Sequence, residues 1–395
     1  MLTLATFLSN DVYHWDVVTV HIARFCHPIE GRFAMKKMRV LMLRKVFHSA
    51  GAWMRARPMV PAVLSGIALL VLAGFGGGAA DDDHQNERDR GASKAAIERF
   101  WSVYHGNQYS AIPQVQAQLQ SAIQRDPDNS TLYALLGATY FWHYGEYTRD
   151  TNLNLSVLQQ DLPNAVNFFG KALELDYYGK HLIGYINDDH LPGYLGITTV
   201  HLGQQNKDPD LIAKGDQMLD FAAYQFPEFN NFNRWAAHNT DSKDSDSYKK
   251  ALDSLWQALD SCAGTTVDRS NPDLKQYLYL QTPTGRKKAC WSEGALAPHS
   301  FEGFMFNLGN GLVKAGQVEA AKIVYANAKY ADNYSTWPYR KYLEDVANSD
   351  LYARAALYSD SDLANDPPTG VPNRGCSYCH ATVPEPVIPA SSGQK

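Results

Sequence analysis

The sequence predicts an all-α fold over residues 93–352, built from pairs of helices that stack into a solenoid. This stretch is rich in helix-forming residues and contains no run with the alternating pattern of a half-buried strand. Small residues recur in it at fixed spacings, which is typical of helical repeats. The 395 residues are 45% hydrophobic and 19% charged, so the chain has the composition of a globular protein with a core.

The first 80 residues have the features of an export signal. Basic residues come first, the apolar run 59–75 follows, and Gly78 and Ala80 stand where a signal peptidase prefers small residues. We therefore expect residues 1–80 to be a signal-peptide region cleaved near Ala80, which makes the rest of the chain periplasmic or otherwise exported. An uncleaved membrane anchor is the alternative, because this apolar run is at the short limit for a spanning helix.

Residues 1–34 are mixed in character, unlike a signal peptide, so we expect the true start to be Met35, Met38 or Met54. Residues 81–92 are expected to be a charged, solvated spacer. The chain after residue 80 has more acidic than basic residues, which argues against a surface for the phosphate backbone. No nucleic-acid partner is expected.

The clearest repeat unit lies near residue 310. Gly309 and Gly316 are seven residues apart and precede Ala321, Tyr325 and Ala328. This spacing resembles the tetratricopeptide-repeat family, in which small residues let two helices approach and an aromatic residue fills the gap beside them. Further units are indicated by Ala122 and Pro127; by Gly137, Tyr140, Ala165, Phe169 and Ala172 with an insertion; and by Gly196, Gly203, Gly215, Leu219, Ala222 and Pro227.

The resemblance covers roughly residues 95–350 and implies a right-handed stack with a concave face that binds peptides or protein partners. An unrelated helical bundle is the alternative. Residues 228–300 interrupt the rhythm and are expected to be an insertion or a diverged pair of repeats, with a helix near 248–260. Residues 353–395 are expected to form a mostly irregular tail.

This tail contains the sequence C-x-x-C-H at Cys376, Cys379 and His380. In c-type cytochromes the two thiols bond the vinyl groups of the haem, and the adjacent histidine is an axial ligand of the iron. Covalent attachment takes place outside the cytoplasm, in agreement with the export signal. The sequence therefore predicts one covalently bound haem c. A zinc or copper site on the same three residues and a redox-active thiol pair are the alternatives.

Only fifteen residues follow His380, so the haem has no domain of its own. It is expected to pack on the repeats, on a partner, or to stay exposed on the polar, Pro-containing arm 360–375. The sixth iron ligand is not evident from the sequence. His299, His143 and Met305 are weak candidates for this ligand or for another site residue.

The other two cysteines of the exported part, Cys262 and Cys290, are expected to form a disulfide, because the motif uses the remaining pair. Closing this loop would stabilise the fold by about 3 kcal/mol in the chain-entropy treatment. Two buried free thiols are the alternative.

The layout resembles a group of exported bacterial proteins that combine helical repeats, an A-P-H-x-x-E-G-F stretch at residues 297–304, a W-P-Y-R stretch at 337–340 and a terminal C-x-x-C-H. The resemblance implies an architecture and no activity. No nucleotide-binding, serine-hydrolase or zinc-protease motif occurs in the sequence. We therefore expect an electron carrier, with a protein partner such as a redox protein docked on the repeats, rather than an enzyme. A scaffold whose C-x-x-C-H binds a metal or is redox-active is the alternative, and peroxidase-type chemistry at the haem remains open.

Overall fold

The computed structural model describes residues 2–8, 14–20, 79–150, 154–177, 189–277 and 300–384, except 361, 363, 364 and 373. It divides the chain into two compact units, Met1–Gly78 and Ala79–Lys395. The apolar run of the expected export signal lies outside the described residues. Among the described residues, no helix is long and apolar enough to cross a membrane.

The described part of the first unit is a β-hairpin of β1 (Leu2–Leu8) and β2 (His14–Val20). The strands are antiparallel, with Leu2 opposite Val20 and Leu8 opposite His14. This hairpin was not expected, although the β-branched residues near the end of β2 favour an extended chain. The all-α prediction therefore holds for the second unit only.

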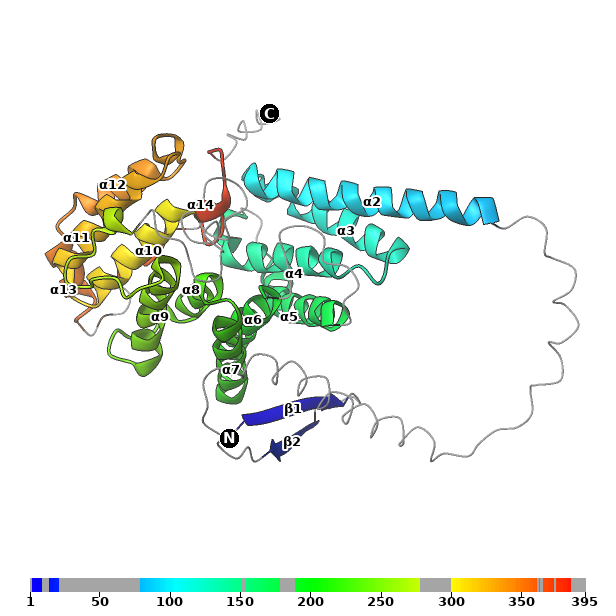
Figure 1. Ribbon diagram of the computed structural model, residues 1–395, viewed down its shortest axis with the longest axis horizontal. Coiled ribbons are helices and arrows are strands. Elements are labelled where there is room, and N and C mark those ends of the chain that lie inside the picture. The colour runs from blue at the N-terminus through cyan, green and yellow to red at the C-terminus, as the bar shows by residue number, and fades with distance from the viewer. Residues whose placement is uncertain are drawn as a thin grey trace, which may run out of the picture. The chain divides into compact units, whose positions relative to one another are not determined.

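The described residues of the second unit form thirteen α-helices (Figure 1). These are α2 (Ala79–His105), α3 (Ile112–Arg125), α4 (Ser130–Gly145), α5 (Leu155–Tyr177), α6 (Leu191–Asn206), α7 (Pro209–Gln225), α8 (Pro227–His238), α9 (Asp246–Ala263), α10 (Phe301–Lys314), α11 (Val318–Asn327), α12 (Arg340–Ala347), α13 (Leu351–Leu357) and α14 (Ser377–His380). Short 3-10 helices cover Tyr109–Ala111, Tyr147–Arg149, Leu274–Gln276, Ala328–Tyr330 and Tyr334–Thr336.

The helices pack in sequential pairs, namely α2 with α3, α4 with α5, α6 with α7, α8 with α9, and α10 with α11. The pair α8 and α9 occupies the first part of the region expected to interrupt the repeats, and α9 contains the helix expected near 248–260. The described start of this region is therefore another helix pair. The charged spacer 81–92 is also helical, since α2 begins at Ala79 and continues through it.

Local signals in the sequence explain where several helices begin. The side chain of Asp208 accepts the Leu211 N–H at the start of α7, and Ser300 accepts the Gly303 N–H at the start of α10. Such caps satisfy backbone donors that have no partner within the helix. Gly264 ends α9 in the left-handed conformation, with φ 69°, which glycine adopts without strain.

Close approach of paired helices follows the expected small-residue positions. A Cβ added at Gly309 of α10 would lie 2.6 and 2.8 Å from ring atoms of Tyr325 on α11. At Gly137 of α4 it would lie 3.2 Å from the ring of Phe169 on α5. At Gly196 of α6 it would meet the side chain of Leu219 on α7 at 2.9 Å. In each pair the residue expected beside the glycine is the one that contacts it.

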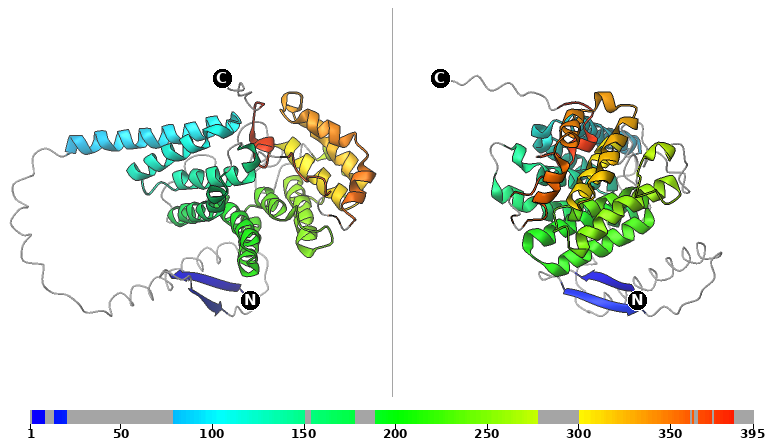
Figure 2. Two further views of the ribbon diagram at one scale, coloured as in Figure 1. Left: turned by 180° about the vertical axis from the view of Figure 1, so that it is seen from behind. Right: turned by 90° about the vertical axis from the view of Figure 1, so that its left-hand side faces the viewer.

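Two large hydrophobic cores lie along the described part of the second unit, with a small cluster of α6, α7 and α8 residues as a third. The first is formed by α2 to α5 and the start of α6, and the second by α8 to α13 together with Tyr378. Cys376 packs against the first core, whereas Cys379 packs against the second. Figures 1 and 2 show α14 beside the C-terminal end of α2 and beside α10, so the motif lies where the two cores meet.

Candidate functional site

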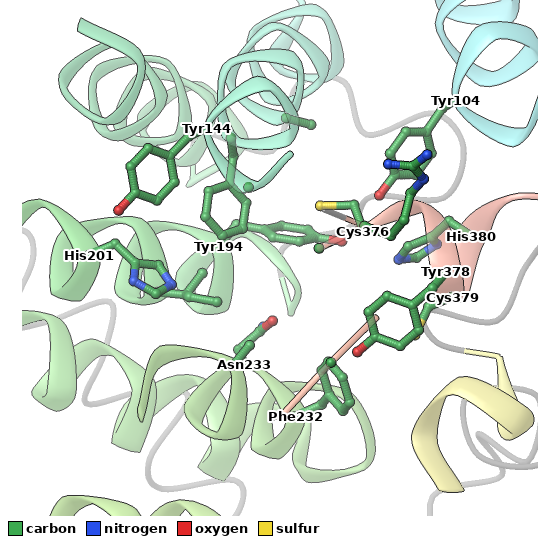
Figure 3. Close-up of a pocket in the computed structure, with 18 of the residues that line it drawn as sticks. Tyr104, Tyr144, Tyr194, His201, Phe232, Asn233, Cys376, Tyr378, Cys379 and His380 are labelled. Carbon is green, nitrogen blue, oxygen red and sulfur yellow. The ribbon is translucent and has the colours of Figure 1, made fainter. Parts of the chain in front are cut away.

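A cavity of about 340 Å³ opens between the two cores and has the three motif residues in its wall (Figure 3). Helices α2, α4, α6 and α8 supply most of the wall, and residues 369–371, 374–376 and 378–380 close it. The lining is mainly aromatic and aliphatic, with few polar groups, as in pockets that hold small molecules or cofactors. Its aromatic residues include Phe100, Trp101, Tyr104, Phe141, Tyr194 and Tyr378.

The single turn of α14 brings the motif together. Cys376, Cys379 and His380 are related by three and four residues, the spacing that places side chains on one side of a helical turn. Both cysteines are free thiols, and both line the cavity. The ring of His380 lies 5.1 Å from that of Tyr104, between centroids, at the same end of the cavity (Figure 3).

Long-range hydrogen bonds hold this turn in place. Oε1 of Glu146 accepts the N–H groups of Cys376, at 2.9 Å, and Ser377, at 2.7 Å. Trp337 Nε1 donates to the carbonyl of Tyr378 at 2.9 Å. The motif turn is therefore docked between the helix pairs.

The tyrosine inside the motif is also fixed. Its hydroxyl is bonded to Asn307 Nδ2, which also donates to the Gly303 carbonyl at 2.8 Å. Oδ1 of the same asparagine accepts Trp235 Nε1 at 2.9 Å. Asn307 thus joins the side chains of Tyr378 and Trp235 inside the second core.

Burial sets the protonation of the motif residues. It raises the pKa of the Cys379 thiol to about 12, and it raises the pKa of Cys376 further, with help from the charge of Glu146. It lowers the pKa of His380 to about 3, and His105 nearby adds to this. At neutral pH the site therefore presents two thiols and a neutral imidazole. A thiol pair that acts by disulfide exchange needs the opposite shift, towards thiolate.

The end of the cavity away from His380 carries a histidine that the sequence analysis missed. Gln204 Nε2 donates to the Ala237 carbonyl at 3.0 Å, so its Oε1 faces His201 and accepts from Nδ1 at 2.9 Å. Nε2 of His201 is then the unprotonated nitrogen, and burial lowers the pKa of this histidine to about 4. Tyr194, Ile197 and His201 line the cavity at helical spacing, a signal that could have found it.

The two described candidates for a sixth ligand, His143 and Met305, are not among the residues that line this cavity. His143 Nδ1 lies 2.6 Å from Oδ2 of the buried Asp161, and its ring stacks on Tyr109. Met305 is fully buried in the second core. His299 lies outside the described residues. His143 is therefore hydrogen-bonded to a buried carboxyl group, and Met305 is a core residue.

Cys262 is buried at the end of α9 and is disulfide-bonded. Cys290, its expected partner, lies outside the described residues, so the pairing of these two stays a prediction. Among the residues that the structure describes, no group of three or more His, Cys, Asp or Glu side chains is arranged to hold a metal ion.

No protein-family model, curated protein or solved structure matches the chain.

Proposed function

We propose that the chain is an exported electron-transfer protein that carries one covalent haem c in the cavity between its two cores. The observation that carries this proposal is the placement of Cys376, Cys379 and His380 in the wall of one aromatic cavity. The residues fit the group, since two free thiols and an imidazole from one turn are the donor set that c-type haem requires.

When bound, the haem supplies an iron centre that takes up and releases one electron. Cys376 and Cys379 would hold it by thioether bonds, and His380 would offer its imidazole to the iron. The mainly apolar walls give the site a low local dielectric, which strengthens the charge interactions there. Since the motif turn is held at several points, little rearrangement of these residues is needed when the electron moves.

We also infer that the helix pairs are degenerate tetratricopeptide-like repeats that form a solenoid. The contacts of Gly309 with Tyr325 and of Gly137 with Phe169 support this inference, because each reproduces the close helix approach of the repeat. A concave repeat surface is suited to docking a protein partner, and an electron carrier needs a redox protein as its partner.

The test is whether the mature protein carries covalent haem. The full chain is expressed with its own export signal in a bacterium that has the c-type maturation system. We expect a haem-stained band on a denaturing gel and an intact mass that includes one haem, with a new N-terminus near residue 81. The double variant C376A/C379A should lose both signals, whereas C262A should keep the haem.

A colourless wild-type protein would overturn the proposal. Zinc or copper that chelators remove would then support the metal-binding scaffold, and a thiol pair that cycles with glutathione would support the redox alternative. For a coloured protein, carbon monoxide binding to the reduced form separates the two haem functions. An iron that binds it readily has an open position and favours catalysis, whereas a closed iron favours electron transfer.

A further inference from the structure

Glu146 is a buried carboxylate that contacts the motif through the backbone. It follows directly after α4 and is 1% exposed. One of its oxygens accepts the N–H groups of Cys376 and Ser377, as described above. The other lies 2.5 Å from Nη1 of Arg149, whose side chain is 3% exposed.

These contacts belong to a closed ring of hydrogen bonds. Arg149 Nη2 donates to the carbonyl of Asn107 at 3.2 Å, and Asn107 Nδ2 donates to the hydroxyl of Tyr339 at 3.1 Å. That hydroxyl lies 3.3 Å from Ser377 Oγ. The ring of hydrogen bonds closes there, because the N–H of Ser377 is bonded to Glu146. Asn107 is fully buried, with φ 54°, so the surrounding structure holds it in an uncommon conformation.

The bonds to the motif backbone do not by themselves require a charged group. Two backbone N–H groups can be accepted by a neutral amide oxygen, and burying an ion pair has a desolvation cost that often cancels its attraction. Among the described residues that line the cavity there is no Asp or Glu. Glu146 therefore places a negative charge beside a cavity wall that has no carboxylate of its own.

We propose that the Glu146–Arg149 ion pair sets the reduction potential of the haem, with Glu146 stabilising the oxidised iron. The inference rests on the proposed function, because it needs a haem at Cys376 and Cys379. Oxidised haem carries one more positive charge than reduced haem, so a nearby carboxylate favours the oxidised form and a nearby guanidinium disfavours it. Glu146 contacts the motif directly and Arg149 contacts it through Glu146, so the carboxylate has the larger effect.

The experiment measures the midpoint potential of the haem-loaded full chain by spectroelectrochemistry. E146Q should raise the potential, and R149Q should lower it. At the effective dielectric of about 20 that describes proteins, one nearby charge is worth roughly a tenfold change in the ratio of reduced to oxidised protein at fixed potential. For a one-electron couple that ratio corresponds to about 59 mV.

The double variant E146Q/R149Q separates an effect of charge on the potential from an effect of misfolding. It leaves no unpaired buried charge, so it is the variant best able to fold, and its potential should return towards that of the wild type. Y339F removes the Tyr339 hydroxyl from the ring of hydrogen bonds without changing any charge. This variant should keep the midpoint potential of the wild type. R234Q is the matched control, since Arg234 is a buried arginine paired with Asp220 outside the cavity lining.

Shifts of the two single variants in the same direction, or potentials equal to that of the wild type, would overturn the inference and leave the haem assignment intact. Loss of haem from both single variants together with a displaced potential in the double variant would also overturn it, because the pair would then be structural. A wild-type protein without haem would overturn the proposed function and this inference with it.

Discussion

Adding one methyl group at Gly303 should test whether the motif turn is packed against α10 as the structure has it. Gly303 lies in the first turn of α10, where its N–H is bonded to Ser300 Oγ. A Cβ at this position would lie 2.9 Å from Ser300 Oγ and 3.3 Å from Cys379 Cβ, and closer still to Cys379 Sγ. Rotation of the cysteine side chain can move Sγ but not Cβ, so the turn itself has to shift.

Two opposing effects decide the size of the change. Replacing glycine by alanine within a helix stabilises it by up to about 1 kcal/mol. Overpacking of a close-packed site costs about 1–3 kcal/mol. Since the first turn of a helix gains less than its centre, we expect G303A to lose about 1–2 kcal/mol of unfolding free energy.

Urea unfolding of the full chain, followed by tryptophan fluorescence, measures this loss. G170A is the matched control, because nothing lies within 4 Å of a Cβ added at Gly170 in α5. This variant should gain about 0.5–1 kcal/mol. If both variants gained stability equally, Cys379 would not be packed against α10, and the docking of the motif described above would be refuted.

Three further predictions concern stability. Burial lowers the pKa of His238, but hydrogen bonds and charges of Asp216 and Asp241 raise it to about 9. The resulting stabilisation, up to about 3 kcal/mol, is fully present below pH 6.5 and is lost as the pH rises through about 9. Urea unfolding across this pH range should show the loss, and in H238Q the unfolding free energy should change less with pH. N307L leaves the buried Trp235 N–H without its acceptor and the buried Tyr378 hydroxyl without its donor, and it should cost about 2–4 kcal/mol in the same assay. A loss below about 1 kcal/mol would contradict these hydrogen bonds. F169A empties a fully buried site and should cost about 3–5 kcal/mol; a thermal midpoint equal to that of the wild type would show that this side chain is not in the core.

The pairing of the helices could be predicted because it depends on residue size at fixed spacing. Gly309 and Tyr325 are sixteen residues apart and in contact, while Gly137 and Phe169 are in contact across twice that distance in the sequence. The residues inserted in the unit of Gly137 lengthen the connection between α4 and α5 and the first part of α5. The glycine and the aromatic ring therefore still meet despite the insertion. Pairing of this kind is encoded locally and can be read from one sequence.

The docking of the tail could not be predicted, since its partners are distant in the sequence. Glu146 and Cys376 are separated by 230 positions, and Asn107 and Tyr339 by 232. No local spacing marks such pairs. The polar arm 360–375 was expected to be able to hold the motif away from the helices. In the structure, Tyr358 and Arg354 donate to the carbonyls of the two adjacent prolines, Pro367 and Pro368, at 2.7 Å each, so this part of the arm is bonded to residues of α13 and its C-terminal end.

Some of the site residues could be predicted from local spacing and others could not. Cys376, Cys379 and His380 are adjacent in sequence, so their spacing alone places them together. The opposite wall of the cavity depends on which helix face turns inward. His143 was considered because aromatic residues flank it, yet Tyr144, one residue later, lines the cavity. A rotation of about 100° per residue separates their directions, and it turns His143 towards Asp161.

The motif has a structural role that its chemistry alone does not require. Cys376 packs against the first core, while Tyr378 belongs to the second, so a single helical turn joins the two. Glu146, directly after α4, and Trp337, in the second core, both bind the backbone of this turn. A group bonded to both cysteines would therefore link the two cores covalently, and any change that releases the turn would loosen the cavity and the joint between the cores together.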